Sequence, residues 1–156
     1  MMANVIVDTC AFSKDWVKRK VIPDLLRSKV KTKVVYSTTD KWKGKISKLS
    51  KYLEFIRLIG RKNRLIKIDE KTSISIEASI SSLSEWNECS CCDDEHLFAA
   101  CLLVNVGYII TEDARLCQCR KIMKNNVPKV ISRRRLNFSA ISNEKVYDRL
   151  RKHIIK

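Results

Sequence analysis

The chain has 156 residues, of which 45% are apolar, so its length and composition fit one globular domain and exclude a disordered chain. Lys and Arg number 32 against 17 Asp and Glu, and this net charge of +15 predicts a polyanionic partner, either nucleic acid or an anionic membrane face. With only three Gly and two Pro, an all-β fold with many tight turns is disfavoured.

No apolar run is long enough to span a bilayer, because the longest, Phe98 to Val106, is interrupted by Asn105. The chain opens directly on the strand-like Val5-Ile6-Val7, without the pattern of a signal peptide. We therefore expect a cytoplasmic protein that binds no membrane and whose seven Cys are reduced thiols. The basic surplus then points to RNA or DNA inside the cell.

Strands and helices are predicted to alternate along the chain. In the first half they are a strand at Val5–Val7, helical residues 16–26 with Pro23 opening a second short helix, a strand at Lys33–Tyr36, and a long basic helix at Lys41–Ile59 capped by Gly60. There follow a strand at Leu65–Ile68, helices at Thr72–Leu83 and Asp93–Val106, a strand at Tyr108–Thr111, a helix at Asp113–Lys124, a strand at Val127–Ser132 and a helix at Glu144–Ile155.

Strands separated by helices of this length predict right-handed crossovers and an α/β fold, a three-layer α/β/α sandwich around a central parallel sheet. No repeat, low-complexity tract or linker divides the chain. We expect residues 1–156 to form a single domain with its core at about 4–132 and a basic terminal helix at about 143–155.

Acidic residues lie at the ends of predicted strands, where parallel sheets carry their working sites. Asp8 ends the first strand and Asp113 follows the strand at 108–111. Asp94 opens the helix before that strand, and because a crossover helix runs antiparallel to its strands, its amino end lies at the same edge of the sheet. Three such carboxylates predict a site for Mg²⁺ or Mn²⁺ rather than zinc. The alternative is that each Asp only ends a strand or caps a helix.

The segments that carry these acids resemble PIN domains. Residues 5–12 (VIVDTCAF) resemble the opening strand of that family, an apolar run followed by Asp, then Thr or Ser, then Asn or Cys. Residues 93–101 (DDEHLFAAC) resemble its central acidic helix, and residues 109–116 (IITEDARL) are similar to its apolar strand followed by Thr, any residue and Asp. The motifs occur in the family's order over residues 4 to about 132.

The resemblance implies a metal-dependent nuclease that cleaves RNA, with Asp8, Asp94 and Asp113 as catalytic metal ligands. Thr9 or Thr111 would support them through hydrogen bonds to the carboxylates or to the scissile phosphate, and Asp93 lies beside Asp94. Many relatives are toxins paired with an antitoxin and others mature or degrade RNA. The resemblance therefore also implies an antitoxin protein as a partner and makes a homodimer plausible.

One position departs from the family pattern. PIN domains usually have a second acid, most often Glu, early in the helix after the second strand, whereas this chain has DKWKGK at residues 40–45. Asp40 is the nearest substitute, and its other interpretation is the N-cap of that helix. The alternative function is therefore a PIN-like module that binds RNA without cutting it.

Two basic runs are the predicted contacts with nucleic acid, namely Lys41, Lys43 and Lys45 and then Arg133, Arg134 and Arg135. Phosphate contacts of this kind supply affinity rather than sequence preference, and the alternative is a solvated basic face. Tyr52 is a candidate for stacking on bases. Trp86 is expected in a loop, exposed near the site.

The remaining Cys and His residues leave alternatives open. Cys89, Cys91 and Cys92 are placed to meet Cys117 and Cys119, but the C-x-C-C and C-x-C spacings favour free thiols over a zinc site. Cys10 and Cys101 are expected in the core. His96 either bonds a catalytic carboxylate or has no role at a metal. A nucleotide-binding α/β domain lacks support, because no glycine-rich phosphate loop is present.

Overall fold

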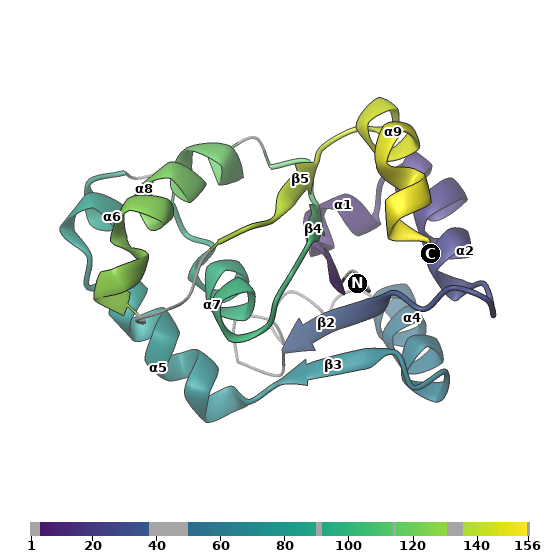
Figure 1. Ribbon diagram of the computed structural model, residues 1–156, viewed down its shortest axis with the longest axis horizontal. Coiled ribbons are helices and arrows are strands. Elements are labelled where there is room, and N and C mark those ends of the chain that lie inside the picture. The colour runs from purple at the N-terminus through teal and green to yellow at the C-terminus, as the bar shows by residue number, and fades with distance from the viewer. Residues whose placement is uncertain (1–3, 38–49, 90–91, 114, 131–135, 156) are drawn as a thin grey trace.

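The protein is an α/β sandwich in which a central sheet of five parallel strands is flanked by helices (Figure 1). The computed structural model describes residues 4–37, 50–89, 92–113, 115–130 and 136–155. Its strands are β1 (Asn4–Val7), β2 (Lys33–Ser37), β3 (Leu65–Ile68), β4 (Tyr108–Ile110) and β5 (Ser139–Ile141). This confirms the fold class predicted from the alternation of strands and helices.

The strands lie in the order β3-β2-β1-β4-β5. The neighbouring strands β1 and β4 are therefore followed by segments that run in opposite directions across the sheet, and the reversal in strand order lies between them. From β1 the chain adds β2 and β3 on one side, then returns to add β4 and β5 on the other. Ligands of open parallel sheets bind outside the carboxyl ends of the strands at such a reversal. In this protein the reversal lies directly after Val7 and Ile110, which are paired in register.

The helices form two groups, one on each side of the sheet (Figure 1). One group contains α5 (Glu70–Ser81), α6 (Ser84–Glu88), α7 (Glu95–Leu103) and α8 (Arg115–Val130). The other contains α1 (Thr9–Phe12), the π-helical turn η1 (Val17–Val21), α2 (Ile22–Leu26), α4 (Ser50–Arg61) and α9 (Glu144–Ile154). None of the helices in the described ranges is long and apolar enough to cross a membrane.

Burial explains why the central elements are apolar on every side. Val5, Ile6 and Val7 of β1 are fully buried, because strands flank β1 at both edges and helices cover the sheet. Helix α7 is buried from His96 through Leu102, which accounts for its lack of a polar face. Helices nearer the surface begin at polar caps: the Asp69 carboxylate accepts the Thr72 N–H at 3.0 Å, and Asn143 accepts the Val146 N–H at 3.0 Å.

The predicted strand at Val127–Ser132 is wrong, because α8 continues to Val130 and the last strand is β5. Leu116, Cys119, Met123 and Val127 are all buried and recur every three or four residues, so Val127 belongs to the core-facing stripe of a helix. A short apolar run does not distinguish a strand from the end of a helix by periodicity alone.

Gly60 is not the cap predicted for the basic helix, because α4 continues through it to Arg61. The residue with a left-handed backbone is Asn63, at φ 54°, a conformation that Asn tolerates better than most residues. Residues 41–49 of the predicted helix lie outside the described ranges. Tyr52 is fully buried, and its hydroxyl donates to the Val7 carbonyl at 2.7 Å, so it is not a base-stacking residue.

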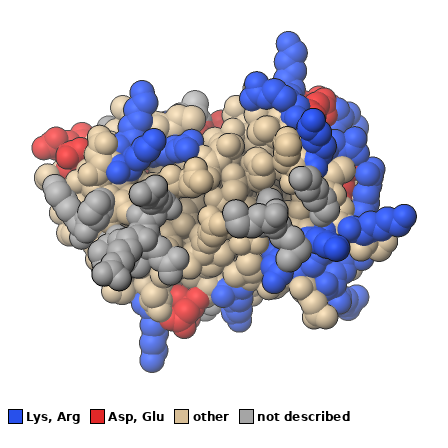
Figure 2. All heavy atoms as spheres, viewed as in Figure 1, with Lys and Arg blue, Asp and Glu red and all other residues tan. Residues whose placement is uncertain are grey.

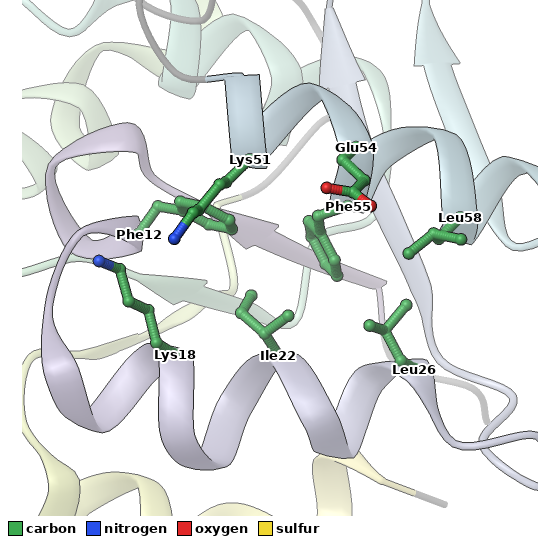
Figure 3. A pocket seen from close by; sticks show the side chains of 8 residues that line it. All are labelled: Phe12, Lys18, Ile22, Leu26, Lys51, Glu54, Phe55 and Leu58. Carbon is green, nitrogen blue, oxygen red and sulfur yellow. The ribbon is translucent and has the colours of Figure 1, made fainter.

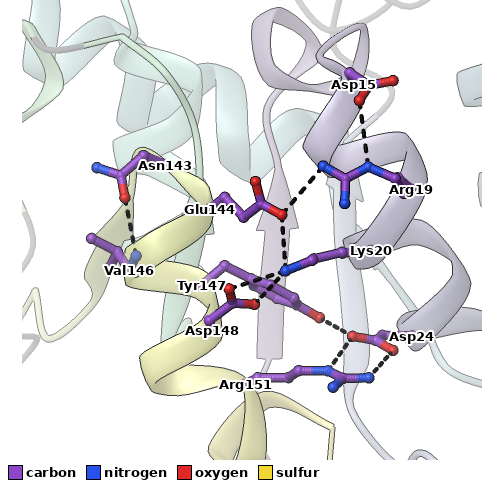
Figure 4. Close-up of polar contacts among 10 residues, drawn as sticks. All are labelled: Asp15, Arg19, Lys20, Asp24, Asn143, Glu144, Val146, Tyr147, Asp148 and Arg151. Atoms are coloured by element: carbon purple, nitrogen blue, oxygen red, sulfur yellow. Dashed lines mark hydrogen bonds and ion pairs between the residues drawn. The ribbon is translucent and has the colours of Figure 1, made fainter.

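Helix α9 is attached to α2 through the buried carboxylate of Asp24 (Figure 4). The Arg151 guanidinium donates to both oxygens of Asp24, at 2.7 and 2.8 Å, and the Tyr147 hydroxyl donates at 2.7 Å. Burial disfavours the charged form of Asp24, but these bonds outweigh it and hold the pKa of Asp24 below its usual value of 3.8. The Asp24–Arg151 pair therefore joins α9 to α2.

We expect Asp24→Asn to lower the free energy of unfolding by about 2 kcal/mol at neutral pH, because Arg151 loses a charged acceptor at a buried position. The pKa of Asp24 is depressed by folding, so its contribution is complete above pH 3.8 and is lost as the pH falls through the lower pKa of the folded protein. We expect the free energy of unfolding of the wild type to approach that of Asp24→Asn as the pH is lowered from neutral to about pH 3, and urea unfolding at each pH measures it.

The matched control is Asp148→Asn, which removes an equal charge from the exposed ion pair with Lys20, at 3.0 Å. This variant should change stability by less than about 1 kcal/mol, because exposed ion pairs contribute little. Equal losses in the two variants would contradict the role assigned to Asp24.

Candidate carboxylate site

Two of the three predicted catalytic residues are joined at the reversal of the sheet. Asp8 follows β1, and its N–H donates to the Ile110 carbonyl of β4 at 2.9 Å. The Thr111 hydroxyl, directly after β4, donates to Asp8 Oδ2 at 2.8 Å and accepts the Asp113 N–H at 3.1 Å. Asp8 and Thr111 are 5% and 1% exposed, so this link between them is shielded from water.

Cys10 also donates to Asp8, an arrangement that sequence reasoning missed. Its Sγ lies 3.1 Å from Asp8 Oδ2 and 3.4 Å from Thr111 Oγ1. Cys10 is exposed, so its predicted place in the core is wrong. Partial desolvation and the charge of Asp8 raise the pKa of the Cys10 thiol, which keeps it protonated as a donor. Its spacing, two residues after an acid that ends a strand, is the signal that would have indicated this contact.

Asp113 is bonded by the guanidinium of Arg115, a residue that the sequence did not indicate as part of the site. Arg115 Nε and Nη2 donate to Asp113 Oδ1 and Oδ2, both at 2.9 Å, and the Arg115 N–H donates to Oδ1 at 3.0 Å. The bond to Asp113 and its charge raise the pKa of Arg115, and the charges of Asp93 and Asp94 add to this effect. Arg115 therefore lies in the field of several carboxylates.

Asp94 is the N-cap residue of α7 and is 6% exposed, on the helix that leads into β4. Its carbonyl accepts the Leu97 N–H at 3.0 Å, whereas its carboxylate makes no capping hydrogen bond to α7. His96 is buried in the first turn of the same helix, and Asp93 is exposed. Thr9, predicted as a supporting residue, is half-buried at the start of α1.

The donor atoms at this edge fit Mg²⁺ or Mn²⁺ in kind, because carboxylate and hydroxyl oxygens suit hard divalent ions. Within the described residues, Asp8 Oδ1 accepts no hydrogen bond, which leaves it available as a ligand. However, no three His, Cys, Asp or Glu side chains in those ranges lie close enough together to hold a metal. Among the described residues, Asp8, Asp94 and Asp113 therefore do not form a closed three-carboxylate group, and Arg115 is a cation that engages Asp113.

Several predicted residues lie outside the described ranges, namely Asp40, Lys41, Lys43, Lys45, Arg133, Arg134 and Arg135. In the remainder of the protein, Lys and Arg side chains project around much of the face in Figure 2, with few acidic side chains among them. Arg115, Lys121 and Lys124 are exposed cations on α8. The expected basic surface is therefore present beyond the two runs.

Trp86 is not an exposed loop residue as predicted. It lies in α6, is 1% exposed and packs edge-on against Phe98, with ring centroids 5.5 Å apart. Its indole N–H donates to Glu95 Oε1 at 2.9 Å. Trp86 therefore helps to hold the first turn of α7, next to Asp94.

An apolar groove of about 310 Å³ lies between η1–α2 and α4, apart from the carboxylates (Figure 3). Lys18 and Lys51 lie towards one end of it. Its lining residues are Phe12, Lys18, Ile22, Leu26, Lys51, Glu54, Phe55 and Leu58. It contains none of the predicted site residues.

Comparisons with known proteins do not identify a family. No family model matches the chain, no curated protein matches it, and no solved structure matches its fold. The PIN resemblance therefore rests on the three sequence motifs alone.

Cys92 and Cys119 form a disulfide, so the prediction of reduced thiols is wrong for this pair. The bond joins the segment just before Asp94 to the second turn of α8, and both residues are buried. The two Cys segments do meet, but the spacing of their cysteines did not predict a bond, because the pairing depends on how α7 and α8 pack. Cys101 is a buried thiol, as predicted.

We expect reduction of the Cys92–Cys119 bond to lower the free energy of unfolding by about 3 kcal/mol, because the loop that it closes, with a sequence separation of 27, gains freedom in the unfolded chain. Urea unfolding with and without dithiothreitol measures the effect. Cys117→Ser, at an exposed thiol on the same helix, should respond like the wild type. The stability of the double variant Cys92→Ser, Cys119→Ser should be the same with and without dithiothreitol. If an alkylating reagent labelled both Cys92 and Cys119 before reduction, their thiols would be free and the disulfide would be contradicted.

Proposed function

We propose that this protein is a divalent-metal-dependent endoribonuclease that hydrolyses RNA phosphodiester bonds at the carboxyl edge of β1 and β4. The observation that carries the proposal is the hydrogen-bonded chain from Asp8 through Thr111 to Asp113 at the reversal of the sheet. The net charge of +15 supports a polyanionic substrate. The three motifs that resemble PIN domains supply the reaction class.

Asp8 and Asp113 would hold the ion, and Asp94, the N-cap residue of α7, would contribute the third carboxylate. The chemistry that Mg²⁺ or Mn²⁺ would supply there is a hydroxide nucleophile near neutral pH and stabilisation of negative charge on the phosphate. The Thr111 hydroxyl and the Cys10 thiol fix the Asp8 carboxylate through Oδ2, and so leave Oδ1 for the ion. Exposed lysines on α8, Lys121 and Lys124, are suited to contact backbone phosphates.

The cytoplasm is the proposed compartment, since it contains the proposed substrate. Its thiol pools reduce accessible disulfides, but Cys92 and Cys119 are 9% and 2% exposed, and this burial shields the bond. An antitoxin protein and a homodimer remain proposals taken from the family resemblance.

The second candidate is a module that binds RNA without cleaving it. The observation that favours it is the Arg115 fork, which occupies both oxygens of Asp113. The absence of an evident Glu at residues 41–45 supports the same function. Such a module would bind RNA without metal and release it as salt rises.

The deciding experiment is cleavage of a panel of structured and single-stranded RNAs with Mg²⁺, Mn²⁺ or EDTA. We expect Asp8→Asn to reduce cleavage at least about 100-fold, because it removes a ligand rather than a supporting contact. Thr111→Val should cost about 10- to 100-fold, since it leaves the carboxylates but removes the hydroxyl that links the Asp8 carboxylate to the backbone N–H of Asp113.

The matched control is Asp15→Asn, which removes one negative charge from an exposed side chain that pairs only with Arg19 in the described residues. It should cleave like the wild type. Equal cleavage by Asp8→Asn and Asp15→Asn would refute the nuclease. Metal-independent RNA binding without cleavage would establish the second candidate.

A further inference from the structure

Three segments that contain no acidic residue come together at the amino edge of the sheet, opposite the edge with Asp8. They are residues 25–37, 55–68 and 149–155, in which Lys and Arg recur while Asp and Glu are absent. They include the connection from α2 to β2, the turn from α4 to β3 and the end of α9. The positive charge of the chain is therefore concentrated in these segments rather than spread evenly.

Arg64 holds these segments together from inside. Its buried guanidinium donates to the Thr32 carbonyl at 3.2 Å and also to the Leu25 carbonyl. The Thr32 hydroxyl donates to the Ile154 carbonyl at the end of α9, and the Val34 N–H donates to the Arg64 carbonyl at 2.8 Å. The three segments therefore form one connected surface, and Arg64 itself has a structural role in it.

The exposed cations of these segments form a surface that we call the basic edge. Figure 2 shows Lys and Arg gathered at the end of the molecule where Figure 1 has α2, α9 and the turn from α4 to β3. The basic edge consists of Arg27, Lys29, Lys31, Arg61, Lys62 and Lys152, which are all exposed. Arg27 lies 3.1 Å from the Asp24 carboxylate. Within the described ranges, the other five form no ion pair.

Neighbouring cations outside the basic edge have acidic partners. Arg19 and Lys20 of η1 both pair with Glu144 of α9, at 3.2 and 2.8 Å, and Lys20 also pairs with Asp148 at 3.0 Å (Figure 4). The contrast shows that acids are available close by but are not placed at the basic edge. Like charges repel there, so a polyanion that neutralises them binds favourably.

Helix C-termini explain part of the basic edge, because cations in the last turn of a helix interact favourably with its dipole. Arg61 and Lys152 occupy the last turns of α4 and α9. Lys29 and Lys31 lie between α2 and β2, and Lys62 lies beyond α4, so the dipoles do not account for them. These three lysines are the cations that most need another explanation.

We propose that the basic edge binds the sugar–phosphate backbone of a nucleic acid. Lys and Arg side chains supply affinity for phosphates without reading the bases and without a metal. The hydrogen bonds of Arg64 fix the segments before binding, which lowers the entropy lost on association. Strand β1 begins beside Lys33 and ends before Asp8, so the basic edge and the carboxylate site lie at opposite edges. The inference therefore goes beyond the proposed function and does not depend on cleavage.

An anionic membrane is the other polyanion that a basic surface attracts. Stable attachment to a bilayer surface needs apolar side chains that enter it. In the described residues, the exposed large apolar side chains are Leu53 and Ile74. Leu53 lies in the first turn of α4, at the opposite end from Arg61, and Ile74 lies in α5. The observations therefore favour a nucleic acid.

The test measures binding of fluorescent single-stranded RNA and single-stranded DNA, each of about 20 nucleotides, by fluorescence anisotropy in EDTA. The basic-edge variant Lys29→Gln, Lys31→Gln, Lys62→Gln should bind both about tenfold more weakly than the wild type, or about twofold for each lost contact. Its plot of log affinity against log salt should be less steep by about 2, because each phosphate contact on a single strand contributes about 0.7. The variant Lys29→Arg, Lys31→Arg, Lys62→Arg keeps the charges and should bind like the wild type.

The matched control is Lys18→Gln, Lys51→Gln, Lys71→Gln, which removes the same charge from exposed lysines outside the basic edge. Its affinity should change less than about twofold, because salt screens charges that lie more than about 10 Å from the bound strand. Urea unfolding of each variant establishes that it is folded at the temperature of the titration.

The possible results separate the basic edge from its alternatives. Equal losses in the basic-edge variant and the control would reduce the effect to net charge and overturn the proposal. A loss for RNA alone or for DNA alone would contradict recognition through phosphates. If the basic-edge variant kept its affinity for both and instead lost binding to vesicles of phosphatidylserine and phosphatidylcholine, the partner would be a membrane and the proposal would be wrong. Absence of binding by the wild type would also overturn it.

Discussion

The parallel pairing of β1 with β4 is the constraint on which the rest of the structure depends. It joins segments about a hundred residues apart, with Val7 opposite Ile110, and so brings Asp8 against Thr111. Because β1 lies between β2 and β4 and helices cover the sheet, its apolar side chains are fully buried, and the first polar side chain after it is the buried Asp8. The polar residues that follow each strand consequently meet at one edge. Without that pairing, Asp8 and Asp113 would be unrelated surface acids.

The protein has two Asp–Arg pairs with two-bond geometry, Asp24–Arg151 and Asp113–Arg115, and they differ in burial. Asp24 is held by Arg151 and by the Tyr147 hydroxyl in a position where water scarcely reaches the carboxylate. Loss of Arg151 would leave the buried Asp24 carboxylate with fewer charged partners, so this fork stabilises the attachment of α9. Asp113 and Arg115 use similar geometry at a more exposed position, where solvent can replace either partner. Similar bonds are therefore shielded from water at Asp24 and more accessible to water at Asp113.

The Cys92–Cys119 bond gives the acidic edge a covalent support. Cys92 lies two residues before Asp94, and Cys119 lies one turn beyond Arg115, so the bond restrains the amino end of α7 relative to α8. Trp86 reinforces the same region through its hydrogen bond to Glu95. Asp94, the third predicted carboxylate, thus lies on a segment restrained by the disulfide, whereas Asp113 is oriented by hydrogen bonds from Arg115 at the start of α8. This difference matters for a site whose ligands come from distant parts of the chain, because each must be positioned independently.

The sequence by itself determined the fold class, four of the five strands and the acids at the strand ends, because these follow from local periodicity and from the burial of both faces of a parallel sheet. Only the tertiary structure decided that Val127 belongs to a helix, that Cys92 bonds Cys119 and that Arg115 covers Asp113. Each depends on which segments pack together. A short apolar run, a Cys and an Arg near an Asp have several local solutions, and contacts with distant residues select among them.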